Sequence, residues 1–355
     1  MIVERVSVEP VSIPLTDPFE ISLGTKTSAE NVLVRLETET ETVGYGESSP
    51  LESIVGETQA SAVAAARAGA QLLEGASLTD RRGLVRELQA ALPGSVSALL
   101  ALETALYDAY CREQEISLAA CFGGETHPIR TDTTISIVDP ATATDEAEAA
   151  LEAGFDELKI KVGSGVDADL ERVGAVRDVA PEAAIKVDAN QGWTPKEAIR
   201  FASEARARGF DLELLEQPVR ADDIAGLARV TRAVDVPVGA DESVFTPADA
   251  VRVVRAEAAD VINIKAAKSG LTDGLAIAEI ARAANLECMV GCMLESAVGL
   301  HASAHLVAGL GGFEYVDLDG NLSHAEPITD VTRGPVLEID GPGHGVVPTY
   351  GSEAN

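Results

Sequence analysis

The sequence predicts an α/β protein built on a (β/α)7β barrel, a modified TIM barrel, with an N-terminal α+β capping domain that the C-terminal tail completes. Three observations predict this fold class. Charged residues recur at steps of 27, 28, 25 and 24 residues, from Lys161 through Asp188, Glu216 and Asp241 to Lys265. Each step fits one strand, one helix and two short loops, the repeat of a (β/α)8 barrel. The segment before this repeat has a different pattern, and the segment after it is rich in glycine and proline.

The beginning of the chain forms the predicted capping domain. Residues 1–48 alternate apolar and polar side chains, which is typical of a half-buried antiparallel sheet. From Thr58 to Phe122 the pattern is helical and rich in alanine, and a pair of glycines then marks a junction. We therefore expect an α+β domain over residues 1–122.

The barrel is predicted over residues 123–322. Several of its helices begin with a threonine followed by proline, a good start for a helix, as at Thr194 and Thr246. Eight strands with seven intervening helices describe a barrel that lacks its last helix. Residues 323–355 are expected to pack back on the capping domain. The candidate strands are residues 130–138, 157–163, 184–190, 212–218, 236–243, 260–267, 287–296 and 313–320.

The charge balance argues against nucleic-acid and membrane partners. The chain holds 27 basic and 58 acidic residues, a net charge of −31, with a pI near 4.4. Such a surface repels nucleic acid and anionic membranes, and no apolar run is long enough to span a bilayer. The acids are spread along the chain, which favours a solvated surface adapted to high salt. We expect a cytoplasmic protein that forms a homo-oligomer.

Lysine is scarce and concentrated in this chain. Of only seven lysines, four lie in two short stretches, as Lys159 and Lys161 and as Lys265 and Lys268. An arginine stays charged near neutral pH, whereas a buried lysine can lose its proton and act as a base. These lysines therefore indicate a chemical role.

The cysteines carry no such signal. Cys111, Cys121, Cys288 and Cys292 lack the CxxC spacing of a redox or zinc motif and imply no disulfide framework. We expect them to be buried small side chains.

The charged residues predict an acid–base metal site at the mouth of the barrel. Asp188, Glu216 and Asp241 each end a predicted strand, and strand ends converge on one face of a barrel. Three carboxylates that leave room for water and substrate suit Mg²⁺ better than zinc. Lys159 and Lys161 point to the same side of their strand, where we expect burial and the neighbouring ammonium to lower a lysine pKa toward that of a base.

Five motifs resemble those of the muconate-lactonizing subgroup of the enolase superfamily, namely KIKVG, KVDANQGW, LLEQPV, ADESVFTP and NIKAAKSG. The similarity covers nearly the whole chain, including PLTDPF, YGE and ETALYDA. The resemblance implies that the three acids bind Mg²⁺, which holds a substrate carboxylate and stabilises the enediolate left by α-proton removal. It makes Lys161 and Lys265 the two acid/base catalysts, on opposite faces of the α-carbon, with Lys159 tuning Lys161. Asn190 and Lys268 are expected to support the metal ligands.

The end of the eighth strand suggests a substrate. Asp317 and Asp319 lie two apart and resemble the Asp-x-Asp signature of the dipeptide epimerases, where the acids hold the substrate's α-ammonium group. A carboxylate pair suits a free amino terminus and disfavours a dianion. Glu295, from the seventh strand, is expected near the same pocket. The resemblance thus implies a Mg²⁺-dependent epimerase that inverts the C-terminal residue of a dipeptide.

One position departs from the L-Ala-D/L-Glu epimerase pattern. In that branch an arginine of the capping loop pairs with the glutamate side chain of the substrate. Here Gly24 stands where the arginine is expected, and Lys26 lies nearby. Lys26 either replaces the arginine as a substrate-binding residue or is an ordinary surface residue, so the preferred dipeptide stays open.

Alternative functions fit the shared motifs. A muconate-type cycloisomerase, an o-succinylbenzoate synthase or an N-acylamino-acid racemase would use the same lysine pair, because only the fate of the enediolate differs. A non-catalytic metal-binding homologue would keep the fold, but the retained lysines argue against it. A Schiff-base lyase that uses a barrel lysine is disfavoured by the three acids.

Overall fold

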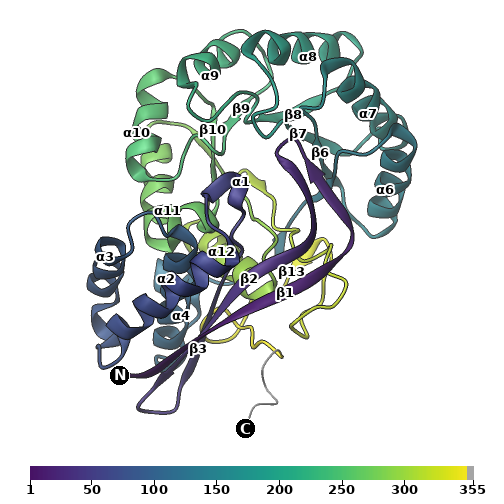
Figure 1. Ribbon diagram of the computed structural model, residues 1–355. Helices are drawn as coiled ribbons and strands as arrows, with labels where there is room; N and C mark the ends of the chain where they lie inside the picture. Colours follow the sequence, from purple (N-terminus) through teal and green to yellow (C-terminus); the bar gives the residue numbers. More distant parts are fainter. Residues whose placement is uncertain (350–355) are drawn as a thin grey trace.

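The structure is a computed structural model that describes residues 1–349 (Figure 1). The elements of its N-terminal part are β1 (Val3–Ile21), β2 (Gly24–Thr38), β3 (Val43–Ser48), α1 (Glu52–Val55), α2 (Gln59–Leu73), the 3₁₀ helix η1 (Leu78–Asp80), α3 (Arg81–Ala91), α4 (Val96–Glu113) and α5 (Leu118–Phe122). The strands form an antiparallel sheet in the order β1-β2-β3, against which α2 and α4 pack. Strands followed by helices are the predicted α+β pattern.

The central part is the predicted barrel (Figure 1). Among residues 1–349, eight parallel strands follow one another in chain order in a single sheet, with one helix between each successive pair. The N–H of Asp132, just before the first of these strands, donates to the carbonyl of Val316 in the last at 3.2 Å. The (β/α)7β prediction is therefore confirmed. The strands are β5 (Thr133–Ile135), β6 (Glu157–Lys161), β7 (Ala184–Asp188), β8 (Leu212–Glu216), β9 (Val238–Ala240), β10 (Val261–Ile264), β11 (Glu287–Val290) and β12 (Tyr315–Val316). The helices are α6 (Pro140–Glu152), α7 (Val166–Val179), α8 (Pro195–Ala207), α9 (Ile224–Thr231), α10 (Pro247–Ala256), α11 (Ala266–Ala283) and α12 (Ala297–Leu310).

Alternation along the strands places charged side chains inside the barrel. On β6, Leu158 and Ile160 belong to the apolar core of the barrel, whereas Lys159 and Lys161 point to the other side. The next strand, β7, repeats this pattern with two apolar residues and two charged ones. The barrel interior is therefore polar near its mouth, although all these side chains are buried.

The helix starts follow the sequence closely, with one exception. Thr194 and Thr246 both accept hydrogen bonds from backbone N–H groups of the first turn, as predicted. The exception is α11, which begins already at Ala266 and bends at Gly270, where φ is +74°. The stretch that follows β10 is thus a short helical turn rather than a loop. None of the helices within residues 1–349 is long and apolar enough to cross a membrane.

Two buried glutamates join the N-terminal part to the barrel. Glu47 accepts hydrogen bonds from the N–H groups of Ser296 at 3.1 Å and Gly299 at 3.0 Å, at the start of α12. Glu103 accepts one from the N–H of Leu271 at 2.9 Å, beside the bend of α11. The first N–H groups of a helix have no partner within it, so these carboxylates supply one. Both contacts fix the N-terminal part against the barrel mouth.

The last described residues pack against the N-terminal part. The N–H of Ala325 donates to the carbonyl of Pro14 at 2.9 Å, and the N–H of His344 donates to Asp108 at 2.9 Å. The division of the chain at residues 122 and 322 stays a prediction, and the end of the predicted tail lies outside the described residues. A short antiparallel pair joins β4 (Ile129–Arg130) to β13 (Val336–Leu337).

Candidate active site

A cavity of about 990 Å³ lies between the barrel mouth and the hairpin of β1 and β2. Its wall combines apolar side chains with a few charged groups, which is typical of a small-molecule site. Lys161, Lys265, Asp317 and Asp319 line it from the barrel, and Lys26 lines it from the hairpin. The structure thus brings these predicted site residues together around one space.

Three carboxylates form a compact group beside this cavity. One oxygen from each of Asp188, Glu216 and Asp241 lies within 4.8 Å of the other two, and all three side chains are buried. These residues stand at the ends of β7 and β8 and directly after β9. Three carboxylate oxygens at this spacing form a donor set that fits a hard divalent cation such as Mg²⁺.

The two proposed catalytic lysines contact different members of this carboxylate group. Lys161 Nζ lies 2.7 Å from Asp188 Oδ2, and Lys265 Nζ lies 2.6 Å from Asp241 Oδ2. The Nζ of Lys268 is 2.5 Å from Asp241 Oδ1. Each oxygen of Asp241 is therefore paired with one lysine ammonium. The amines thus approach the carboxylates from two strands on opposite sides of the group.

Lys159 is surrounded by carboxylates. Its Nζ lies 2.7 Å from Glu216, 2.6 Å from Asp317 and 3.3 Å from Asp188. Burial alone would lower the pKa of Lys159, but these carboxylates raise it well above its usual value. The three carboxylates thus outweigh burial and keep Lys159 charged, and its expected role of tuning Lys161 stays a prediction.

At Lys265, the second proposed catalyst, burial and neighbouring carboxylates also act on the pKa in opposite directions. Burial lowers the pKa of Lys265, and the carboxylate of Asp241 more than reverses this effect, so the pKa lies above its usual value. A divalent cation shared by the triad would compete for the same carboxylate charge and weaken this attraction.

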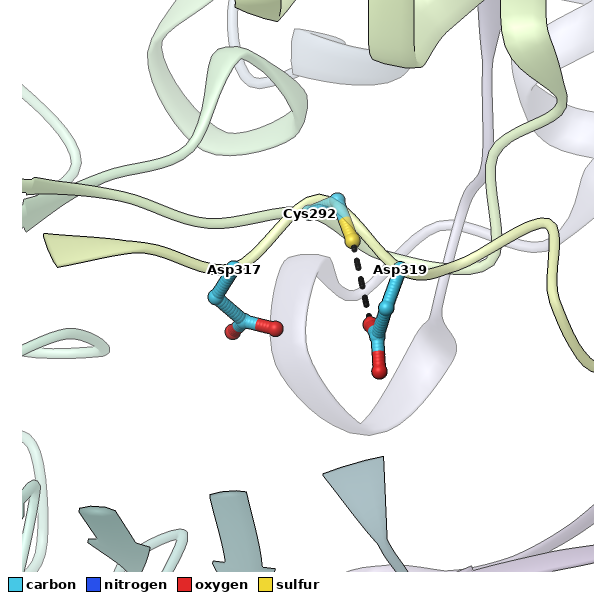
Figure 2. A group of neighbouring side chains, drawn as sticks. All are labelled: Cys292, Asp317 and Asp319. Atoms are coloured by element: carbon cyan, nitrogen blue, oxygen red, sulfur yellow. Dashed lines mark hydrogen bonds between the residues drawn. The ribbon is translucent and has the colours of Figure 1, made fainter. Parts of the chain in front are cut away.

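Asp317 and Asp319 extend in the same direction after β12, and Cys292 lies between them after β11 (Figure 2). Asp317 is paired with Lys159, whereas Asp319 Oδ2 accepts a hydrogen bond from the N–H of Thr134 at 2.6 Å. The Cys292 thiol is 3.9 Å from Asp319 Oδ1. Burial and the charge of Asp317 raise the pKa of Asp319 to about 6. Asp319 is therefore the less compensated carboxylate of the pair.

Two predicted substrate-binding residues differ in their placement. Lys26 lines the cavity, is partly exposed and has no ion-pair partner within residues 1–349. Glu295 is buried but does not line the cavity, because its carboxylate turns back to accept a hydrogen bond from the N–H of Met293 at 2.6 Å. Met293 and Leu294, which precede Glu295 in the chain, do line the cavity, so Glu295 lies near the pocket as expected, and a contact with the substrate stays a prediction.

Asn190 occupies the supporting position that we predicted. Its N–H donates to Asp188 Oδ1 at 2.8 Å, and its side-chain amide donates to Glu242 at 3.2 Å. Its φ of +39° is unusual for a non-glycine residue and indicates a backbone constrained by its surroundings. Lys268 likewise supports Asp241, with a hydrogen bond to its backbone carbonyl besides the ion pair.

Sequence reasoning missed two residues of the site. Cys292 was assigned to packing but lines the cavity beside Asp319, and its place at the end of the seventh strand was the available signal. Ser22, at the tip of the β1–β2 hairpin, donates its hydroxyl to the carbonyl of Asn190 at 2.7 Å. No pattern in the sequence predicts this contact, which connects the hairpin to the loop beside the carboxylates.

Family comparisons agree with this geometry. Residues 3–123 match the mandelate racemase / muconate lactonizing enzyme N-terminal domain, and residues 142–351 match the enolase C-terminal domain-like family. The chain belongs to the enolase superfamily. The resemblance drawn from the motifs is thereby confirmed.

Several similar members of the enolase superfamily are named epimerases. The L-Ala-D/L-Glu epimerase of Bacillus subtilis is 38% identical over 94% of this chain and 91% of its own, and its substrate-liganded structure superposes with a TM-score of 0.95. The aromatic dipeptide epimerase of Herpetosiphon aurantiacus is 38% identical over 97% of this chain and 98% of its own. The dipeptide epimerase of Enterococcus faecalis, in a structure with Mg and L-Leu-L-Tyr, is 34% identical over 98% of this chain and 99% of its own, with a TM-score of 0.93. The chain is therefore an enzyme of the racemase and epimerase class.

Proposed function

We propose that this protein is a Mg²⁺-dependent dipeptide epimerase that inverts the α-carbon of the C-terminal residue by proton transfer between Lys161 and Lys265. The observation that carries the proposal is their arrangement, because both amines line one cavity and contact different carboxylates of the triad. Asp317 and Asp319 line the same cavity. The names of the similar enzymes support the choice of a dipeptide as substrate.

The triad would hold the metal ion. Asp188, Glu216 and Asp241 offer buried oxygens at a spacing that fits Mg²⁺, and a similar enzyme has been seen with Mg. Bound there, the ion would supply positive charge beside the substrate carboxylate, which favours loss of the neighbouring α-proton.

The two lysines would share the proton transfer. With the α-carbon between them, the neutral amine of one lysine removes the proton from one face while the ammonium of the other delivers a proton to the opposite face. Exchanging their roles accounts for the reverse reaction. Lys159 would act as a positioning residue, since three carboxylates hold its ammonium group and raise its pKa well above the usual value, which keeps it charged.

The charge of the cavity supports a substrate with a free amino group. Asp317 and Asp319 would receive the ammonium. Four further carboxylates line the cavity against the single additional lysine, Lys26. This excess of negative charge disfavours muconate, succinylated amino acids and dipeptides that carry an acidic side chain besides the terminal carboxylate. The four carboxylates are those of Asp17, Glu20, Glu52 and Glu146.

A dipeptide library in D₂O tests the proposal directly. The protein is incubated with Mg²⁺ and concentrated KCl, and each dipeptide is analysed by mass spectrometry. Gain of one deuterium at the C-terminal residue, together with the opposite configuration at that carbon, is the expected result. Exchange confined to N-acylamino acids or muconate-like acids would instead identify one of the related activities. No exchange with any of these substrates, in a folded protein that binds Mg²⁺, would contradict the assignment.

The acidic surface carries a separate proposal. We infer that the net charge of −31 reflects adaptation to high salt, because at low ionic strength such a charge destabilises the compact state by self-repulsion. The homo-oligomeric state and the cytoplasmic location stay predictions.

A further inference from the structure

Arg172 connects the end of the strand that carries Lys161 to the end of the neighbouring strand. It lies on α7, and its side chain is buried. Its Nη1 donates to the carbonyl of Lys161 at 3.2 Å, and its Nε donates to the carbonyl of Val138 at 2.7 Å. Val138 follows β5 and lines the cavity. The planar guanidinium thus holds the two carbonyls at a fixed separation.

Asp169 holds this guanidinium in place. Its Oδ1 lies 2.9 Å from Arg172 Nη1, and both side chains are buried. The same carboxylate accepts hydrogen bonds from the backbone N–H groups of Gly163 at 2.9 Å and Gly165 at 3.0 Å, and from the indole of Trp193 at 3.2 Å. Asp169 therefore fixes both the guanidinium and the loop that follows β6.

The peptide unit between Lys161 and Val162 is held at both of its polar ends. Its carbonyl accepts a hydrogen bond from Arg172, and its N–H, which belongs to Val162, donates to the carbonyl of Asp188 at 2.9 Å. The side chain of Lys161 starts next to this peptide and ends 2.7 Å from Asp188 Oδ2. A displacement of the peptide would therefore shift the amine of Lys161 relative to the carboxylate triad.

The other proposed catalyst is held in a different way. The carbonyl of Lys265 accepts hydrogen bonds from the N–H groups of Lys268 at 2.9 Å and Ser269 at 3.2 Å, in the first turn of α11. Backbone bonds of this kind belong to any helix start. A change at Arg172 should therefore disturb Lys161 and leave Lys265 in place.

We propose that Arg172, oriented by Asp169, is a positioning residue for proton transfer at Lys161. The inference rests on the proposed reaction with two lysines, and it explains how one of the two amines is held. A buried ion pair often adds little net stability, so the geometry that this pair fixes is its main contribution. A misplacement of about 1 Å at a reacting group can cost roughly 100-fold in rate. Loss of Arg172 should thus act on one face of the α-carbon.

Proton exchange measured on each face separately tests this role in the intact Mg²⁺-loaded enzyme. Exchange in D₂O is followed for the two configurations of the C-terminal residue of one dipeptide, and Lys161→Ala identifies the configuration that depends on Lys161. In Arg172→Gln, kcat for that configuration should fall about 10- to 100-fold, while its KM changes less than about threefold. Exchange on the other configuration should change less than about threefold, because Lys265 keeps its place.

Arg177→Gln is the matched control. Arg177 lies on the same helix, and its guanidinium donates to the carbonyls of Ala183 at 2.8 Å and Asp211 at 2.7 Å, just before β7 and β8 begin. This variant should lower the unfolding midpoint in urea and show no preference between the two configurations. Arg172→Lys keeps a positive charge beside Asp169 but lacks the planar fork. It should fold and show the same selective loss to a smaller degree, so it decides the question if Arg172→Gln does not fold.

The results separate this inference from the proposed function. If the wild type exchanges both configurations and the folded Arg172 variants slow both equally, or neither, Arg172 does not position Lys161 and the inference fails. If the wild type exchanges neither configuration, the proposed function fails, and the inference fails with it.

Discussion

Replacing Asp319 by asparagine should weaken recognition of the substrate's amino group and leave the rest of the site intact. Asp317 already lies 2.6 Å from the ammonium of Lys159, whereas Asp319 faces only the N–H of Thr134 and the thiol of Cys292 within residues 1–349. An incoming ammonium should therefore gain more from Asp319. The asparagine keeps an oxygen for the Thr134 N–H, so the local structure should persist.

The expected size of the effect follows from one charged hydrogen bond. Such a bond contributes about 1.5–3 kcal/mol, which corresponds to a fall of roughly 10- to 150-fold in kcat/KM for a free dipeptide. An N-acetylated or deaminated analogue makes no such bond, so its kcat/KM should change less than about threefold on the same scale.

The pH dependence provides a second readout. Burial and Asp317 raise the pKa of Asp319 to about 6, and its ionised form is the one that binds an ammonium. In the wild type, kcat/KM for the free dipeptide should therefore fall as the pH drops below about 6, and this fall should be absent from Asp319→Asn.

The assay measures α-proton exchange for both substrates in wild type, Asp319→Asn and a control, Asp17→Asn. The control removes a carboxylate from the exposed rim of the same cavity. Equal losses for the free and the acylated substrate in Asp319→Asn would refute the reasoning. The reasoning would also fail if Asp17→Asn lowered kcat/KM for the free dipeptide, relative to the acylated substrate, as much as Asp319→Asn does. The negative charge of the cavity as a whole would then explain the preference without a specific contact.

Replacing either Lys161 or Lys265 by alanine should lower epimerisation by about 10²–10⁴-fold. Deuterium exchange should remain on the one diastereomer whose α-proton faces the remaining lysine. Equal exchange on both diastereomers would contradict a mechanism with two bases. Asp241→Asn should weaken Mg²⁺ binding more than about 100-fold by calorimetry, and chelation should abolish activity until Mg²⁺ is restored. Gly46→Ala places a Cβ against the backbone of α4 and should cost about 1–3 kcal/mol in urea unfolding, whereas Gly334→Ala, in open space, should be nearly neutral. The melting temperature should rise with KCl, because salt screens the repulsion within a net charge of −31.

Much of the fold and of the carboxylate triad could be predicted because barrel strands recur at a nearly fixed interval. The spacing of Asp188, Glu216 and Asp241 implied three strand ends, and the structure places their oxygens within 4.8 Å. The pairing of Lys159 and Lys161 on one side of a strand follows from the twofold repeat of a strand in the same way.

Loops and long-range contacts do not recur at a fixed interval, so they could not be predicted in the same way. The carboxylate of Glu295 accepts a hydrogen bond from a backbone N–H two residues earlier and does not line the cavity. Ser22 reaches Asn190 only because the hairpin extends over the barrel mouth. Neither outcome depends on a repeating pattern, so local sequence carries no signal for it.

The sequence alone determined the order of the strands and helices, the residues that face the barrel interior and the acid–base character of the site. These properties depend on backbone periodicity and on side-chain chemistry, both of which are local. Only the tertiary structure decided the charge balance of Lys159, which lies beside Glu216 and Asp317. Burial and electrostatic neighbours fix a pKa, and those neighbours come from distant segments that meet only when the chain is folded.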